Sequence, residues 1–251
     1  MKYKSKQLLS ALLAAALIFC LLAASPMTVS ADWAVTLEAE LESFKVFRGV
    51  NTYTPGQFSD VREGVWYSGV IAKAYEYGLM KGSGANTFNL SGNMTVAEAV
   101  TIAARVHSIY HGGDGEFVQG DPWYQVYVDY AIDNGIITAG AFSNYNKAAT
   151  RAEMAYIFAR TSVPVLLAYT AIHDPPNIVN SLPDVNSSTR HYNYIISLYQ
   201  AGILAGSDEK GTFHPNSSVT RAEAAAIIIR LIILDERING RTYGKTEDSL
   251  S

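Results

Sequence analysis

The chain of 251 residues is 49% hydrophobic and 17% charged, with a formal net charge of −4. A chain with this balance has no basic field to attract nucleic acid or an anionic membrane, so we expect neither as a partner. Its length is enough for one sizeable hydrophobic core or a few small ones.

The first 31 residues have the pattern of a signal peptide. Three Lys residues precede an apolar stretch from Leu8 to Leu22, and small residues follow at 29–31. The apolar stretch is about 15 residues long, which is short for a membrane span of about 20. We therefore expect residues 1–31 to be cleaved and the rest to be secreted, with no membrane association. Cleavage also removes Cys20, the only Cys, so the exported part must be held together by packing alone.

A Thr-x-Ala-Glu phrase occurs three times, at residues 95–98, 150–153 and 220–223. Each copy opens a run rich in Ala, Ile and Val, which indicates one structural unit used three times. Thr followed by Glu three residues later is also the sequence pattern of a helix capping box. We therefore assign a helix-capping role to six residues: Thr95, Glu98, Thr150, Glu153, Thr220 and Glu223.

The segment before each phrase predicts another helix and a loop. Apolar residues at helical spacing end at a Gly, which suits a left-handed helix end, and a loop with one Phe leads to the capping phrase. The Gly residues are Gly78, Gly135 and Gly202, and the Phe residues are Phe88, Phe142 and Phe213. No stretch alternates strictly enough to require a sheet. We therefore expect an all-α fold of three helix-loop-helix repeats.

These patterns divide the chain into seven segments. After the signal peptide at 1–31 we expect a lead-in, three repeats, a Pro-containing linker before the last repeat, and a polar tail. The expected ranges are 32–57 for the lead-in, 58–112, 113–163 and 182–235 for repeats one to three, 164–181 for the linker and 236–251 for the tail.

Arg occupies the first helical position after two of the capping Thr residues, as Arg151 and Arg221. The helix dipole is positive there and disfavours a cation by about 0.3–1 kcal/mol, so stability alone does not explain both. A helix N-terminus with free amides beside a guanidinium is suited to bind a carboxylate or phosphate. The alternative is that each Arg pairs with an acid of the adjacent repeat. Repeat one has Val96 at this position, so its site should be weak or absent.

Trp66 and Trp123 stand at matching positions near the start of the first helix in repeats one and two. An indole beside a polar loop is suited to stack on a sugar ring, but a Trp at this place is as readily a core residue. In repeat three the matching residue is Arg190, with His191 and Tyr192 beside it. The groove there has either changed its partner or lost an aromatic residue.

Taken together, these residues resemble the S-layer homology (SLH) domain family. In repeat one the resemblance rests on Phe58-Ser59-Asp60-Val61, Trp66, the loop at Gly82 with Thr87-Phe88, and the capping phrase. In repeat three it rests on residues 202–206, 211–216 and 219–223. The resemblance extends over residues 58–234.

The resemblance implies a fold, a ligand and a location. SLH triplets form a pseudo-threefold spindle around a central helical bundle, and they attach exported proteins non-covalently to Gram-positive type bacterial surfaces, in the cell wall or S-layer. Their ligand is secondary cell wall polysaccharide, which commonly carries a pyruvate ketal and lies in grooves between repeats. By position, the resemblance assigns polysaccharide binding to Arg151, Arg221, Trp66, Trp123, Gly82 and Gly206.

Each repeat departs from the family pattern in one place. Repeat one has Val96 instead of Arg, repeat two lacks the Phe-x-Asp-Val opening, and repeat three lacks the Trp. We therefore expect fewer than three working grooves, and a reduced avidity for a repeating polymer.

Two other functions are alternatives to attachment. A wall-polysaccharide hydrolase would need catalytic or metal-binding residues, but His107 and His111 have no evident third ligand, and no nucleophile or cofactor motif occurs. We therefore predict no enzyme, no catalytic residues, no metal and no cofactor. The second alternative is a structural or adaptor protein that assembles with itself or binds a protein partner through residues 33–53.

Overall fold

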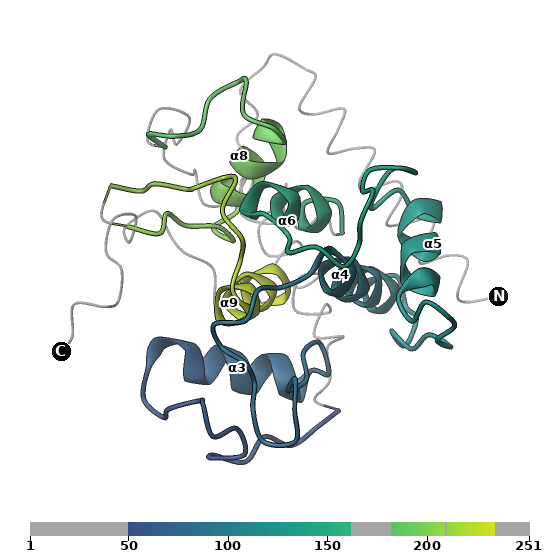
Figure 1. Cartoon of the computed structure of the whole chain (residues 1–251), viewed down its shortest axis with the longest axis vertical. Coiled ribbons are helices and arrows are strands. Elements are labelled where there is room, and N and C mark those ends of the chain that lie inside the picture. The colour runs from purple at the N-terminus through teal and green to yellow at the C-terminus, as the bar shows by residue number, and fades with distance from the viewer. Residues whose placement is uncertain (1–49, 162–181, 209, 234–251) are drawn as a thin grey trace, which may run out of the picture. The chain divides into compact units, whose positions relative to one another are not determined.

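The computed structural model describes residues 50–161, 182–208 and 210–233, all within one compact unit, Phe44–Ser251. In these ranges the regular structure is helical, and extended residues pair only in isolated bridges (Figure 1). The helices are α3 (Trp66–Glu76), α4 (Val96–Tyr110), α5 (Gln125–Asp133), α6 (Arg151–Phe158), α8 (Tyr192–Gln200) and α9 (Arg221–Ile232). The predicted all-α class is therefore confirmed.

Helices α4, α6 and α9 each begin directly after the Thr of the repeated phrase. The Thr95 hydroxyl accepts a 3.2 Å hydrogen bond from the Glu98 amide, and the Glu98 carboxylate accepts a 2.8 Å bond from the Thr95 amide. The same reciprocal pair forms at the start of α6 and of α9. Because a capping box satisfies two amides that would otherwise lack partners, the phrase fixes where each of these helices begins.

The first helix of each repeat ends at a Gly in the left-handed region. Gly78, Gly135 and Gly202 all have a φ of +69°. The two amides that follow bond back into the helix, as Leu79 and Met80 do to the Ala74 carbonyl, both at 3.0 Å. The turn places the side chains of Leu79 and Met80 in the core. This is the helix ending that the sequence predicted.

Each first helix packs against the second helix of the preceding repeat. Helix α5 of repeat two packs on α4 of repeat one, and α8 of repeat three packs on α6 of repeat two. Helix α3 of repeat one packs on α9 of repeat three, which completes the series (Figure 1). The repeats are therefore interleaved, so the apolar face of one is buried by another.

Backbone hydrogen bonds among the segments that precede α4, α6 and α9 close into a cycle. The Met94 amide donates to the Val219 carbonyl, the Val219 amide to Ala149, and the Ala149 amide to Met94, at 2.9, 3.2 and 2.8 Å. All three side chains are fully buried. Each repeat is thus bonded to both of the others in the described part of the chain, while the outline of a spindle stays a prediction.

Several expectations lie outside the described residues. They concern the signal peptide at 1–31, most of the lead-in with the expected partner segment 33–53, the linker at 164–181 and the tail at 236–251. Within the described ranges, no helix is both long and apolar enough to cross a membrane.

Candidate functional site

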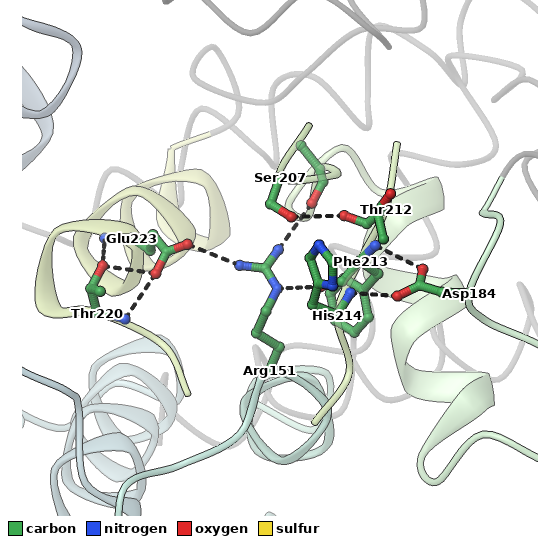
Figure 2. Close-up of polar contacts among 9 residues, drawn as sticks. Arg151, Asp184, Ser207, Thr212, Phe213, His214, Thr220 and Glu223 are labelled. Atoms are coloured by element: carbon green, nitrogen blue, oxygen red, sulfur yellow. Dashed lines mark hydrogen bonds and ion pairs between the residues drawn. The ribbon is translucent and has the colours of Figure 1, made fainter. Parts of the chain in front are cut away.

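The guanidinium group of Arg151, the first residue of α6, is bonded within the chain through all three of its nitrogens (Figure 2). Nε donates a 2.6 Å hydrogen bond to the Phe213 carbonyl, and Nη2 donates a 3.1 Å bond to the Ala205 carbonyl. Nη1 forms a 3.2 Å ion pair with the Glu223 carboxylate. The guanidinium carbon also lies 4.9 Å from the centre of the Phe213 ring, a cation–π contact. Arg151 is only 8% exposed, and it fastens repeat two to repeat three.

Arg221, the first residue of α9, makes the same set of contacts with repeat one. Nε donates a 3.0 Å hydrogen bond to the Phe88 carbonyl, and Nη2 donates a 2.6 Å bond to the Lys81 carbonyl. Nη1 forms a 2.8 Å ion pair with Glu98, and the guanidinium lies 5.0 Å from the centre of the Phe88 ring. Arg221 is 7% exposed. The two Arg residues therefore connect successive repeats in the same way.

Repeat one has Val96 at this position, so the capping Glu of repeat two, Glu153, has no Arg partner from repeat one. Lys147, also in repeat two, pairs with Glu153 instead. Lys147 Nζ forms a 2.6 Å ion pair with Glu153, whose side chain is only 5% exposed. A buried carboxylate without a partner would be costly. Burial tends to raise the pKa of Glu153, but its bonds to Lys147 and Thr150 lower that pKa overall. Each capping Glu thus has a cation partner within the chain.

The sequence allowed two interpretations of Arg151 and Arg221, and these contacts agree with the second, in which each Arg pairs with an acid of the adjacent repeat. An external anion would have to compete with Glu223 for Arg151, and with Glu98 for Arg221. The carboxylates are not deeply buried, since the two Glu side chains are 35% and 33% exposed. In this structure both Arg residues act as connections between repeats, and a ligand role for them stays a prediction.

The two loop Gly residues lie next to the carbonyls that accept hydrogen bonds from these Arg side chains. A Cβ on Gly82 would be 2.7 Å from Phe58 Cε1 and 2.8 Å from the Thr87 carbonyl oxygen. A Cβ on Gly206 would overlap the backbone of Gly211. Close packing inside each loop therefore accounts for Gly at both positions.

Two Asp residues hold the loops that precede α4 and α9, a role that the sequence analysis did not assign. Asp60 accepts hydrogen bonds of 2.8, 2.7 and 3.1 Å from the three amides of residues 88–90. Asp184 does the same with two amides of the corresponding loop, at 2.8 and 2.6 Å (Figure 2). Burial tends to raise the pKa of Asp60, but the three amides lower it overall. The sequence feature that could have indicated this role is the Asp-Val pair at the start of repeats one and three, Asp60-Val61 and Asp184-Val185.

Trp66 and Trp123 are each 42% exposed. Each indole packs edge-on against the Tyr that follows it, with ring centroids 5.5 and 5.6 Å apart. Trp123 also lies 6.5 Å from the ring of Tyr127 on α5. Each Trp thus keeps much of its surface open to solvent, and stacking on a sugar stays a prediction for both.

A groove of about 270 Å³ lies where α6 of repeat two meets α8 of repeat three. We call it the α6–α8 groove. Its main lining residues are Phe142, Tyr156, Arg160, Arg190, His191 and Tyr194. Two of them are cations, three are aromatic and none is an acid. The groove therefore combines positive charge with ring faces, which suits a small anionic ligand that has an apolar side.

Arg160 is held at one side of the α6–α8 groove. Its Nε donates a 2.7 Å hydrogen bond to the Gly135 carbonyl, and its Nη1 donates a 2.9 Å bond to the Tyr194 hydroxyl. The guanidinium carbon lies 5.5 Å from the centre of the Tyr156 ring. Within the described part of the chain, no acid forms an ion pair with Arg160 or with Arg190. Neither charge therefore has a direct carboxylate contact among the described residues.

Arg190 and His191 line the groove directly before α8. Arg190 is exposed and takes the position that Trp66 and Trp123 have in the other repeats. His191 has a φ of +63°, and its ring stacks on Tyr156 with centroids 4.6 Å apart. Its Nε2 atom is buried and has no hydrogen-bond partner among the described residues, which costs about 1–3 kcal/mol for a polar atom. Sequence reasoning noted this pair, but it interpreted Arg160 as a structural cation near the C-terminal end of its helix and did not connect it with a ligand.

His107 and His111 stack at the end of α4, with ring centroids 4.1 Å apart. Nδ1 of His107 lies 3.0 Å from the Tyr130 hydroxyl of α5. Burial, and to a smaller extent His111, lowers the pKa of His107 to about 4. The pair is thus a neutral contact between the two helices, and no set of three metal-ligating side chains occurs in the described ranges.

Two segments of the chain match the model of the S-layer homology domain, residues 57–100 and 181–225. They contain the Asp residues that hold the loops, both loop Gly residues, and the capping phrases that open α4 and α9. Repeat two lies outside both segments, although it has the same capping box and left-handed Gly. The resemblance to the SLH family is therefore confirmed for two of the three predicted repeats.

Three curated relatives are surface-layer proteins. The chain is 31% identical over 113 residues to the Surface-layer 125 kDa protein of Lysinibacillus sphaericus, which is 41% of this chain and 10% of that protein. It is 27% identical over 165 residues to S-layer protein EA1 of Bacillus anthracis, which is 64% of this chain and 18% of the relative. It is 24% identical over 163 residues to the S-layer protein of Bacillus licheniformis, with 63% and 17% covered. The chain thus spans less than a fifth of each relative.

Proposed function

We propose that this protein attaches non-covalently to a bacterial cell surface by binding an anionic wall polysaccharide between its repeats. The two SLH segments and the S-layer relatives support a surface location and attachment in general. The α6–α8 groove, with its two Arg residues and no acid, carries the finer proposal. Secondary cell wall polysaccharide with pyruvate ketals is the ligand class that agrees with both the resemblance and this charge.

The size of the groove suits one charged sugar residue of such a polymer. Ligand sites commonly measure about 300–1,000 Å³, and the α6–α8 groove lies slightly below this range with about 270 Å³. Tyr194, which is half-buried, offers a ring face to a sugar, and a ketal carboxylate would lie against the guanidinium groups. A charge-assisted hydrogen bond of this kind contributes about 1.5–3 kcal/mol.

The two Arg residues of the groove have different tasks in this proposal. Arg160 is already bonded to Gly135 and Tyr194, so it supplies a fixed charge at the base of the site. Arg190 is exposed, so its side chain can close on the ligand. Arg151 and Arg221 are left to connect the repeats, because each is paired with a Glu of its neighbour.

Trp66 and Trp123 would provide weaker additional contacts along the same polymer. Trp123 occupies in repeat two the position that Arg190 has in repeat three, and it lies against Tyr127 of α5. A sugar stacked there would gain an apolar contact without a second cation beside it. Several weak contacts on one polymer raise the overall affinity through effective concentration. No catalytic step is assigned to these residues.

Co-sedimentation with bacterial walls tests the proposal. The protein should sediment with walls that carry pyruvylated polymer and stay in solution with walls from which that polymer has been extracted. Arg190→Ala should bind at least about tenfold more weakly, because it removes a charge-assisted contact of about 1.5–3 kcal/mol. Arg62→Ala, an exposed Arg outside the groove, serves as the matched control and should bind like the wild type.

Two results would contradict the proposal. Equal sedimentation with both kinds of wall would exclude the polymer as the ligand. Equal binding by Arg190→Ala and the wild type would exclude the α6–α8 groove as the site. Sedimentation that follows neither the polymer nor Arg190 would favour the adaptor alternative, in which the partner is a wall protein.

A further inference from the structure

His191 is the one side chain of the α6–α8 groove whose polar atom is buried without a partner. The residue caps the N-terminus of α8 in the left-handed region, at φ +63° and ψ 22°, which is uncommon for residues other than Gly, although His adopts it more often than most. Its side chain makes no capping hydrogen bond. The ring is held parallel to Tyr156 instead, at an interplanar angle of 19°. The backbone conformation and the stacking therefore fix the imidazole in the groove rather than in solvent.

The charges around His191 favour its neutral form when the groove is empty. The groups that face it are Arg190 beside it, Arg160, Tyr156 and Glu153 from repeat two, and Tyr194 on α8. Burial first, and then Arg190, lowers the pKa of His191, while Glu153 raises it. The Glu153 carboxylate is already engaged by Lys147 and the Thr150 amide. Glu153 is thus committed to other partners, and the protonated imidazole is disfavoured.

An anionic ligand would supply a counter-charge. A carboxylate beside Arg190 and Arg160 would bring negative charge next to the His191 ring, which lines the same groove, and a negative charge nearby favours the protonated imidazole. Building on the proposed function, we infer that His191 takes up a proton as the ligand binds, and that the imidazolium then attracts the acid group of the ligand through its charge. His191 is thus a specificity-determining residue of the groove and makes binding dependent on pH.

The direction of the pH dependence follows from proton linkage. Because the bound form holds a proton that the free form lacks, lowering the pH favours the complex. The effect lies between the pKa of His191 in the free protein, which burial holds below the ordinary value near 6.5, and its higher pKa in the complex. A rise of one pKa unit on binding corresponds to a tenfold difference in affinity between pH values above and below these two pKa values. The ketal carboxylate stays ionised there, since carboxyl groups titrate near pH 4.

Isothermal titration with purified pyruvylated wall polysaccharide at pH 7.5, 6.5 and 5.5 tests the inference. The wild type should bind severalfold more tightly at pH 5.5 than at pH 7.5, in line with linkage. Repeating the titration at pH 6.5 in buffers of different ionisation enthalpy should show proton uptake on binding. This second measurement needs no variant, so it is independent of any effect of mutation on folding.

Two variants separate His191 from other titrating groups. His191→Gln keeps a hydrogen-bond donor but has no titrating group, so its affinity should be nearly constant across the three pH values. His214→Gln is the matched control, because His214 is also in the left-handed region, at φ +55°, but is exposed and outside the groove. It should keep the full pH dependence of the wild type.

The outcomes distinguish this inference from the proposed function. Binding that is independent of pH, or a pH dependence that His191→Gln retains, overturns the role of His191 and leaves the wall ligand in place. Absence of binding at every pH, or equal binding to polymer from which the ketals have been removed, overturns the proposed function and the role of His191 with it.

Discussion

Arg221 at the start of α9 and Glu98 in the first turn of α4 are 123 residues apart in the chain and 2.8 Å apart in space. Glu98 divides its carboxylate between two tasks. Its Oε2 accepts the Thr95 amide and completes the capping box, while its Oε1 accepts Nη1 of Arg221. One acid therefore starts a helix and joins the third repeat to the first.

Arg221→Ala should lower the free energy of unfolding by about 2–4 kcal/mol. The range lies between the loss of one charge-assisted hydrogen bond and the breaking of a buried ion pair. The change also leaves the Phe88 and Lys81 carbonyls without their donor. Urea unfolding followed by circular dichroism measures the effect, with the exposed Arg62→Ala as control. An unfolding midpoint equal to that of the wild type would show that the contact contributes little.

Lys147→Ala should destabilise the protein, and Val96→Arg should restore part of the loss. Without Lys147 the nearly buried Glu153 carboxylate keeps only its capping bonds, at a cost of about 1–3 kcal/mol. An Arg at position 96 would stand where Arg151 and Arg221 stand in the other repeats and would face Glu153. Urea unfolding of both single variants and the double variant gives the coupling. Additive effects of the two changes would contradict the equivalence of the three positions.

Gly206→Ala should destabilise the loop before α9, because its Cβ would overlap the Gly211 backbone. We expect a loss of about 1–3 kcal/mol, as for overpacking elsewhere. Gly69→Ala is a matched control, since Gly69 lies within α3 and has nothing within 4 Å of an added Cβ. That change should be neutral or stabilising by about 0.5–1 kcal/mol, because Ala favours a helix interior over Gly. Equal melting temperatures for the two variants would show that the loop adapts to a side chain.

The helix boundaries could be predicted from the sequence because the signals that set them are local. A capping box needs residues three apart, and the left-handed end at Gly78 depends on that residue alone. The order of the helices in the fold was not contained in these signals. Packing of α3 on α9 joins the first repeat to the last, and only the family resemblance pointed to such closure.

The candidate site could be predicted only in part, for a related reason. Arg at the first helical position was correctly recognised as unfavourable without a nearby anion, but the anion lies on another repeat. The sequence left open that this anion is an acid of the adjacent repeat, but it did not identify the second oxygen of the capping Glu as the partner. Nor did the sequence indicate that the two cations of the α6–α8 groove lie close together. Arg160 follows an apolar helix like any surface residue, and its approach to Arg190 depends on how α6 meets α8.

The His107–His111 contact should make the protein less stable as the pH falls below neutral. Burial first, and then His111, lowers the pKa of His107 to about 4 in the folded state, whereas an unfolded His has a pKa near 6.5. Above pH 6.5 the imidazole is neutral in both states, so its contribution is fully present. As the pH falls toward 4, the unfolded chain takes up the proton first, and stability is lost. Burial lowers the pKa of His111 in the same direction.

Urea unfolding at pH 7 and pH 5 measures this loss before most carboxylates titrate. His107→Gln keeps a hydrogen-bonding group toward Tyr130 but removes the titration, so it should lose less stability over this interval than the wild type. His214→Gln, which changes an exposed His, should lose as much as the wild type. If His107→Gln and the wild type lost stability equally, the contact between α4 and α5 would not depend on a neutral imidazole, and the acid sensitivity would have to come from other groups.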